Sequence, residues 1–234
     1  MVLLFLIAAR FITSPAPNGI GQDSSTCFNV ISATATEPKP ADDHLNHTIR
    51  YREQQHFMAT KPTIYKLGVT ISDLNRDYYQ THQLTIALHP SETHARMIAR
   101  IMAFCLNAEE HLTFSRGLSD NDEPDIWSHS LDGQTELWID VGEPSVDRVK
   151  KSTRLAKSVR VYSFNSKSDV WWQKSASDFS QLKATYYRFS WPQIQALTAL
   201  IERTMTLSVT ISEESAFIAG DAGEFELSWT TLSP

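Results

Sequence analysis

The sequence predicts a mixed α/β (α+β) fold in which a mixed central sheet is flanked by helices. Alternating hairpin-like runs occur near both ends of the patterned region, and helical and strand periods are interleaved along the chain between them. Residues 135–164 place one helix between two β-type runs. A strand–helix–strand unit of this kind predicts a parallel pair with a right-handed crossover.

Composition limits the classes of function. The 234 residues can bury a sizeable core and suggest one domain. The net charge is −6, so no global field attracts nucleic acid, and such binding would need a local basic patch. The two cysteines, Cys27 and Cys105, support neither a disulfide framework nor a zinc cluster. They fit a reducing compartment, and we expect a cytoplasmic protein.

The first 57 residues differ from the rest. Residues 1–9 are apolar but too short to span a bilayer. Arg10 follows this run, whereas a secretory signal has its basic residues before it. Residues 13–57 are rich in Ser, Thr, Pro, Asn and Ala and lack a period, which is typical of disorder. We expect a disordered extension over 1–57 with Met58 as the true start, and one domain over 58–234 without membrane contact. A cleaved signal and a genuine disordered tail are the alternatives.

The domain begins with a predicted β-hairpin. Apolar residues alternate over 63–72 and again over 78–89, and a polar turn separates the two runs. The next element is a helix over 91–108, for which Ser91 is a good N-cap and Glu92 would suit the dipole of the first turn. An apolar stripe at helical spacing supports it.

The later elements follow from the same periods. Ser145 is the expected N-cap of a basic helix, and Pro192 suits the first turn of another. The expected elements are strands at 112–117, from about Asp125, 135–141, 159–164, 182–189, 205–211, 216–218 and 224–229, and helices at 145–157, 168–175 and 191–204.

Residues 91–164 have the order α-β-β-β-α-β, which resembles the core of the PD-(D/E)XK nuclease superfamily. That core holds Pro-Asp on its second strand and Asp/Glu-x-Lys on its third. Here Pro124-Asp125 stands at the second strand and Asp140 near the end of the third. Hydrolysis of a phosphodiester requires an activated water and a stabilised anion, and Mg²⁺ bound by carboxylates supplies both.

The lysine of the Asp/Glu-x-Lys pattern is missing from its usual position. A lysine near the attacking water would stabilise negative charge, but Gly142 occupies its place, and Lys150 on the next helix is the substitute candidate. A glutamate from the first helix often joins such sites, and Glu92, Glu109 and Glu110 are the candidates.

The same residues also have a purely structural explanation. Asp125 would cap a turn, Asp140 would satisfy loop amides, and Lys151 would pair with Asp147 one helical turn away. The basic run 148–160 either contacts phosphates or forms a solvated helix face. Trp171 and Trp172 either stack on bases or belong to the core.

Several longer motifs, in a fixed order from about Met58 to the C-terminus, resemble the YaeQ family of small bacterial proteins. They are His89-Pro-Ser-Glu-Thr, Phe114-Ser-Arg-Gly-Leu, Asp122-Glu-Pro-Asp-Ile-Trp, Leu137-Trp-Ile-Asp-Val-Gly-Glu-Pro, Arg148-Val-Lys-Lys, Trp171-Trp-Gln and Arg203-Thr-Met-Thr-Leu. The resemblance implies a restriction-endonuclease-like core with a variant PD-(D/E)XK site. By position it makes Asp125 and Asp140 the metal carboxylates and Lys150 the substitute lysine.

Two functions follow from these observations. The first is a Mg²⁺-dependent, nuclease-like phosphodiesterase acting on DNA or RNA with Asp125, Asp140, Lys150 and Glu92. The second is a catalytically silent module on a nuclease fold that binds nucleic acid or protein, because a fold alone does not decide activity. The first requires these side chains to converge in an open cleft. Oligomeric state is left open.

Overall fold

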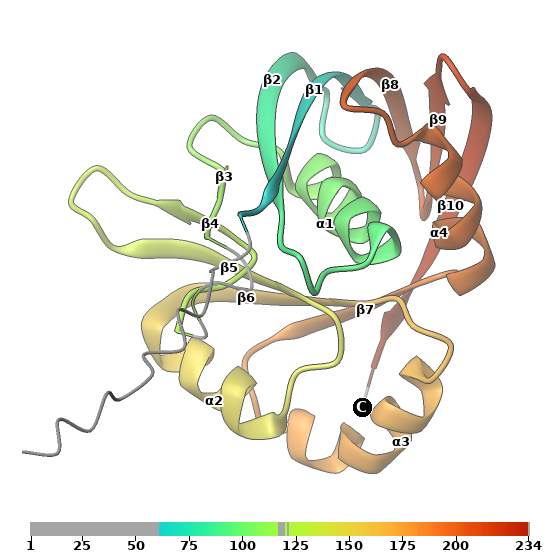
Figure 1. The fold of residues 1–234 in the computed structure, drawn as a ribbon. Coiled ribbons are helices and arrows are strands. Elements are labelled where there is room, and N and C mark those ends of the chain that lie inside the picture. The colour runs from blue at the N-terminus through green and yellow to red at the C-terminus, as the bar shows by residue number, and fades with distance from the viewer. Residues whose placement is uncertain (1–60, 117–119, 121, 234) are drawn as a thin grey trace, which may run out of the picture. The chain divides into compact units, whose positions relative to one another are not determined.

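The computed structural model describes residues 61–116, 120 and 122–233 (Figure 1). The expectations for residues 1–57 and for Met58 lie outside these residues. The described part is a mixed α/β fold, as predicted, built on one large, nearly closed ten-stranded sheet. No helix in the described part is both long and apolar enough to cross a membrane.

The strand order in the sheet is β2-β1-β8-β9-β10-β7-β6-β5-β4-β3. The elements are β1 (Thr63–Asp73), β2 (Tyr78–Leu88), α1 (His94–Asn107), β3 (Thr113–Phe114), β4 (Ile126–His129), β5 (Thr135–Val141), α2 (Val146–Leu155), β6 (Ala156–Ser163), α3 (Ser168–Phe179), β7 (Thr185–Phe189), α4 (Trp191–Leu197), the 3-10 helix η2 (Thr198–Leu200), β8 (Thr204–Ser212), β9 (Ser215–Gly220) and β10 (Gly223–Leu232).

The pairing of the strands confirms two sequence predictions. β1 and β2 form an antiparallel hairpin whose register runs from Thr63 opposite Leu88 to Asp73 opposite Tyr78. β5 and β6 are parallel and are joined through α2. The local periods do not predict that β1 also pairs in parallel with β8, far along the chain.

Two hydrophobic cores lie on opposite faces of β5. The sheet curves around α1, whose apolar stripe lies in the larger core (Figure 1). Ile139 of β5 joins that core, whereas its neighbour Trp138 joins a smaller core with Val149 of α2 and Phe179 of α3. Because helices cover both faces, β5 is an almost continuous buried run, and its last residue before Val141 is a buried aspartate, Asp140.

The first helix begins later than predicted. Thr93, not Ser91, is its N-cap, and the Thr93 hydroxyl accepts a hydrogen bond from the backbone N–H of Arg96 at 3.2 Å. Glu92 therefore precedes the helix instead of lying in its first turn. Its buried carboxylate pairs with the guanidinium of Arg100, 2.8 Å away, which holds the preceding turn in place.

Other predicted boundaries shift where strand pairing or packing outweighs local propensity. The helix expected over 145–157 ends at Leu155, because Ala156 already pairs with Thr135 of β5. The helix expected over 168–175 continues to Phe179, which packs in the smaller core. The revised ranges for the predicted segments 112–117, 182–189 and 191–204 are 113–114, 185–189 and 191–197 with a 3-10 turn to 200.

Candidate functional site

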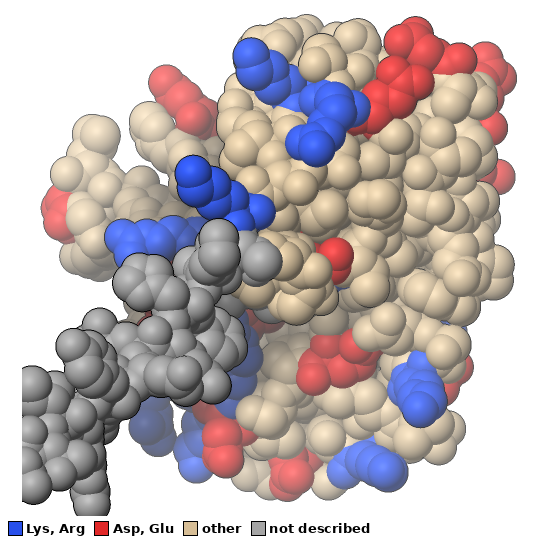
Figure 2. Space-filling model, in the orientation of Figure 1, with Lys and Arg blue, Asp and Glu red and all other residues tan. Residues whose placement is uncertain are grey.

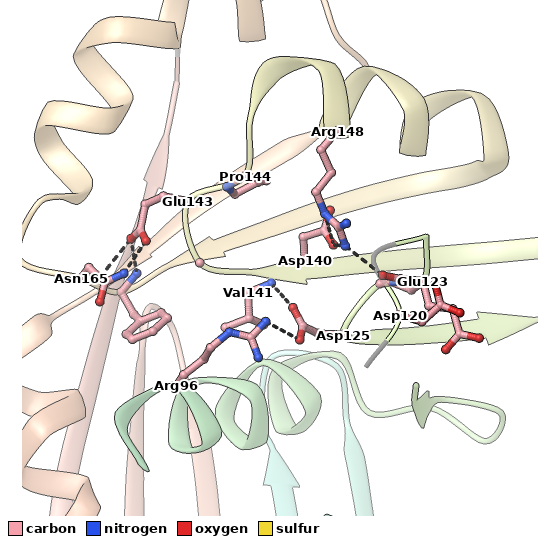
Figure 3. A pocket seen from close by; sticks show the side chains of 13 residues that line it. Arg96, Asp120, Glu123, Asp125, Asp140, Val141, Glu143, Pro144, Arg148 and Asn165 are labelled. Atoms are coloured by element: carbon pink, nitrogen blue, oxygen red, sulfur yellow. Dashed lines mark hydrogen bonds and ion pairs between the residues drawn. The ribbon is translucent and has the colours of Figure 1, made fainter. Parts of the chain in front are cut away.

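A cavity of about 320 Å³ opens beside the ends of β4 and β5 (Figure 3). Its walls come from the segment before β4, the end of β5 and the turn after it, the first turns of α1 and α2, and the segment after β6. The charged residues that line it are Arg96, Asp120, Glu123, Asp125, Asp140, Glu143 and Arg148. Carboxylates outnumber guanidinium groups in this set.

Asp125 and Asp140 both line this cavity. β4 and β5 are antiparallel, and their pairing ends with Ile126 opposite Ile139, next to both aspartates. The backbone N–H of Asp125 donates to the carbonyl oxygen of Ile139 at 3.0 Å, one residue out of the ladder register, so Asp125 and Asp140 are neighbours without being paired residues. Both aspartates are buried. The structure therefore brings together the two carboxylates that the sequence predicted on adjacent strands.

Both carboxylate oxygens of Asp125 are engaged. Oδ2 accepts a hydrogen bond from the backbone N–H of Val141 at 2.8 Å, and Oδ1 lies 2.7 Å from Nη2 of Arg96. Arg96 also pairs with Glu92 at 2.9 Å. Burial alone would lower the pKa of Arg96, but the carboxylates of Asp125 and Glu92 raise it overall, so this guanidinium is held firmly in its charged form.

Asp140 is only partly satisfied. Its Oδ1 accepts from Nη2 of Arg148 at 2.7 Å and from Nε at 3.2 Å, whereas its Oδ2 is buried and has no hydrogen-bond partner. Burial raises the pKa of Asp140, Arg148 opposes the rise, and Asp125 adds to it. The indole of Trp138 also lowers this pKa, although its Nε1 completes no hydrogen bond. One oxygen of Asp140 is thus buried without a hydrogen-bond partner.

Arg148, and not Lys150, is the cation beside Asp140. Arg148 lines the cavity and also donates to the carbonyl oxygen of Glu123 at 2.9 Å. Lys150 is exposed and does not line the cavity, because two residues along a helix turn the side chain by about 200°. Lys151 binds Asp122 at 2.6 Å instead of the predicted Asp147.

The three candidate glutamates do not line the cavity. Glu92 is buried and reaches Asp125 only through Arg96. Glu109 and Glu110 follow the C-terminal end of α1 and are exposed. Among the candidates, Glu92 alone is connected to the aspartates.

The backbone conformation at position 142 explains why a glycine stands where the nuclease pattern has a lysine. The φ of Gly142 is 125°, a conformation that side chains rarely adopt, and its N–H donates to the carbonyl oxygen of Tyr162 at 2.9 Å. The next residue, Glu143, accepts hydrogen bonds from Ser168 Oγ at 2.8 Å and from the backbone N–H of Asn165 at 3.2 Å. The turn after β5 is thereby tied to the segment before α3.

The residues fit a cation that takes few protein ligands. The described residues contain no group of three or more His, Cys, Asp or Glu side chains placed to hold a metal ion. Mg²⁺, however, is commonly bound through one or two carboxylates, with water and substrate oxygens completing its shell. Asp140 has one buried oxygen without a hydrogen-bond partner, while Asp125 would have to exchange its contact with Arg96 for a metal.

Sequence reasoning did not identify Arg96 and Arg148 as members of this site. Arg96 is separated from Asp125 by 29 residues, so no local spacing indicates the pair. Arg148 had a usable signal. It lies in the first turn of a helix that begins a few residues after the strand of Asp140, and short connections keep such a turn close to the strand end.

Known proteins match this chain over about three quarters of its length, in the part that follows the first 57 residues. The family model described as YaeQ protein matches residues 58–229. The uncharacterised protein YaeQ of Escherichia coli (strain K12) is 37% identical over 177 residues, which cover 74% of this chain and 97% of that protein. The crystal structure of the YaeQ protein from Xanthomonas axonopodis pv. citri has a TM-score of 0.71 and 35% identity, covering 74% of this chain and 99% of that one. The crystal structure of the YaeQ protein from Pseudomonas syringae has a TM-score of 0.71 and 34% identity, covering 74% of this chain and 97% of that one.

Proposed function

The chain belongs to the YaeQ family, and we propose that it is a Mg²⁺-dependent, nuclease-like phosphodiesterase with a variant PD-(D/E)XK site. The similar Escherichia coli protein is itself uncharacterised, so the proposal depends on the site. One observation carries it: Asp140 shares an acid-rich cavity with Asp125 and keeps one buried carboxylate oxygen without a partner.

An unpartnered buried carboxylate oxygen is costly, because it has lost water without gaining another contact. A bound cation would compensate this cost. Hard carboxylate oxygens are the ligands that Mg²⁺ prefers, and the cavity adds Asp120, Glu123 and Glu143 to the local negative charge. We assign Asp140, with Asp125, to hold the ion.

When bound, Mg²⁺ polarises a phosphoryl oxygen and lowers the pKa of a coordinated water. The residues of the chain supply the remaining functions. Arg148 and Arg96 are guanidinium groups on the wall of the cavity, and such groups bind phosphate oxygens through paired N–H donors. In this proposal Arg148 takes the charge-stabilising role that the sequence suggested for Lys150, and Glu92 positions Arg96.

The order of elements supports the restriction-endonuclease-like interpretation. Along the chain, α1, β3, β4, β5, α2 and β6 reproduce the α-β-β-β-α-β order. In the sheet, β3, β4, β5 and β6 are consecutive neighbours. Asp125 directly precedes β4, and Asp140 lies in β5, which are the second and third strands of that unit.

A cleavage assay tests the proposal. The full chain is incubated with end-labelled single-stranded and double-stranded DNA and RNA in Mg²⁺, in Mn²⁺ and in EDTA. We expect cleavage that requires the metal, is lost in Asp140→Asn, and is kept in Lys150→Ala, whose side chain is exposed on the same protein. The proposal fails if neither metal supports cleavage and calorimetry detects no binding of Mn²⁺.

A second candidate is a module that binds nucleic acid or protein without catalysis. The observation that favours it is the charge compensation already present, because Arg96 occupies Asp125 and Arg148 occupies one oxygen of Asp140. In that case the arginines would be structural partners of the aspartates. The cleavage assay separates the two candidates, since a silent module cleaves none of the nucleic acids. It would bind its partner with equal affinity in EDTA and in Mg²⁺.

A further inference from the structure

We propose that a groove along α3 binds single-stranded nucleic acid and leads it to the candidate site. This α3 groove is lined by Glu143, Asn165, Lys167, Val170, Trp171 and Lys174. The inference rests on the proposed function, because it assigns a substrate class to the same site. Phosphates would contact the two lysines, and one unpaired base would stack near Trp171.

The α3 groove adjoins the cavity that holds the two aspartates. Glu143 and Asn165 line both of them. The hydrogen bonds from Asn165 to Glu143 hold these shared residues together. A ligand lying in the groove would therefore end next to the cavity that Asp140 lines.

The charge of the groove is complementary to a phosphate backbone. Lys167 and Lys174 are exposed, and neither has an ion-pair partner among residues 61–116, 120 and 122–233. Glu143 is occupied by donors from Asn165 and Ser168. Seven residues separate the lysines, which places them on the same side of α3 and about 10 Å apart along its axis. The groove thus presents two uncompensated cations beside an acidic cavity.

Trp171 provides an aromatic surface between these lysines. It is half-buried, and its Nε1 donates to the carbonyl oxygen of Pro144 at 3.0 Å. Its ring also packs against Phe179, with centroids 5.2 Å apart. A ring held at two points loses little conformational entropy on binding. Bases stack on such rings with little dependence on sequence.

The same features favour a single strand over a duplex. A duplex hides the faces of its bases, so Trp171 would have nothing to stack on. Duplex binding also relies on many phosphate contacts over a broad basic surface. Figure 2 shows, on the face in view, lysine and arginine side chains in small separate groups among acidic ones. An acidic peptide would satisfy the lysines but would not use the ring.

Fluorescence anisotropy of a labelled oligothymidylate tests the inference. Binding is measured in EDTA, so that it does not depend on a metal or on cleavage. The variant is Lys167→Ala/Lys174→Ala, and the matched control is Lys183→Ala, an exposed lysine that lies outside the α3 groove. Each lost single-strand phosphate contact lowers the salt slope of log K by about 0.7. We expect the slope of the double variant to fall by about 1.4 and its affinity to fall about 25-fold at 0.1 M salt, with the control unchanged.

Three outcomes would overturn the inference. They are an unchanged affinity in the double variant, equal competition by a duplex of the same length, and equal competition by an oligoglutamate peptide. Each of them leaves the proposed function standing if Asp140-dependent cleavage is observed. Conversely, if the oligonucleotide binds through the α3 groove but no metal-dependent cleavage occurs, the binding groove is supported and the phosphodiesterase function is rejected.

Discussion

Asp125 and Asp140 line one cavity at the ends of β4 and β5, and each carboxylate is turned toward a different arginine (Figure 3). Asp125 binds Arg96 from α1, and Asp140 binds Arg148 from α2. The two acidic charges are thereby compensated from opposite sides. This arrangement tolerates the burial of two neighbouring carboxylates, and it leaves one buried oxygen of Asp140 without a hydrogen-bond partner.

The first prediction separates the two basic residues of α2. We expect Arg148→Ala to lower cleavage by roughly 100-fold, because a positioned cation that stabilises developing charge contributes on this scale. Lys150→Ala should leave the rate within about twofold, since exposed surface charges contribute little. The measurement is the single-turnover rate of cleavage in Mg²⁺. Circular dichroism of both variants checks the fold, and equal losses in both would contradict the assignment.

The second prediction concerns the cost of keeping Asp140 charged. Folding raises the pKa of this carboxyl above its ordinary value of 3.8. The protonated form therefore favours the folded state, and this contribution is complete below pH 3.8 and is lost as the pH rises through the folded pKa. At pH 7 the charged side chain is therefore a burden. We expect Asp140→Asn to raise the free energy of unfolding by about 1 kcal/mol at pH 7, as functional carboxylates often reduce stability.

The control for this prediction is pH itself. Urea unfolding of both proteins at pH 7 and at pH 3.5 should show the difference between Asp140→Asn and the parent shrinking at the lower pH. An unchanged or growing difference would show that the carboxylate is not the group responsible.

The sequence predicts the two aspartates of this site better than it predicts the side chains that contact them. The alternating runs place Asp125 and Asp140 at the ends of adjacent strands, because element order and period two are local properties. The contact of Arg96 with Asp125 depends on where α1 begins. Thr93 caps that helix, and the buried pair of Glu92 and Arg100, which no capping rule includes, holds the turn before it.

Long-range pairing limits the prediction of the fold in the same way. The parallel pairing of β1 with β8 joins Lys66 to Thr204, and neither segment carries a local sign of the other. Lys150 illustrates the limit at the site. Its residue type suits the chemistry, but helix phase decides that Arg148 reaches Asp140.

The third prediction concerns Glu92. Its carboxylate and the side chain of Arg100 are 2% and 3% exposed, so Glu92→Gln leaves a buried guanidinium without its counter-charge. We expect a loss of about 3 kcal/mol in the free energy of unfolding. Arg96 also loses a partner, and the variant should therefore bind metal and substrate less tightly. Replacing Glu109, which is exposed, by Gln is the matched control and should change stability by less than about 0.5 kcal/mol.

The fourth prediction tests the cation directly through stability. A ligand that binds the folded state alone stabilises it by about 2.7 kcal/mol at 100 times its Kd, which corresponds to a rise in Tm of about 5–10 °C for a domain of this size. We expect a saturable rise of this kind with Mg²⁺ or Mn²⁺, measured by scanning fluorimetry. A matched concentration of sodium chloride controls for ionic strength. The rise should disappear in Asp140→Asn and persist in Lys150→Ala, and a rise of equal size in Asp140→Asn would place the ion elsewhere.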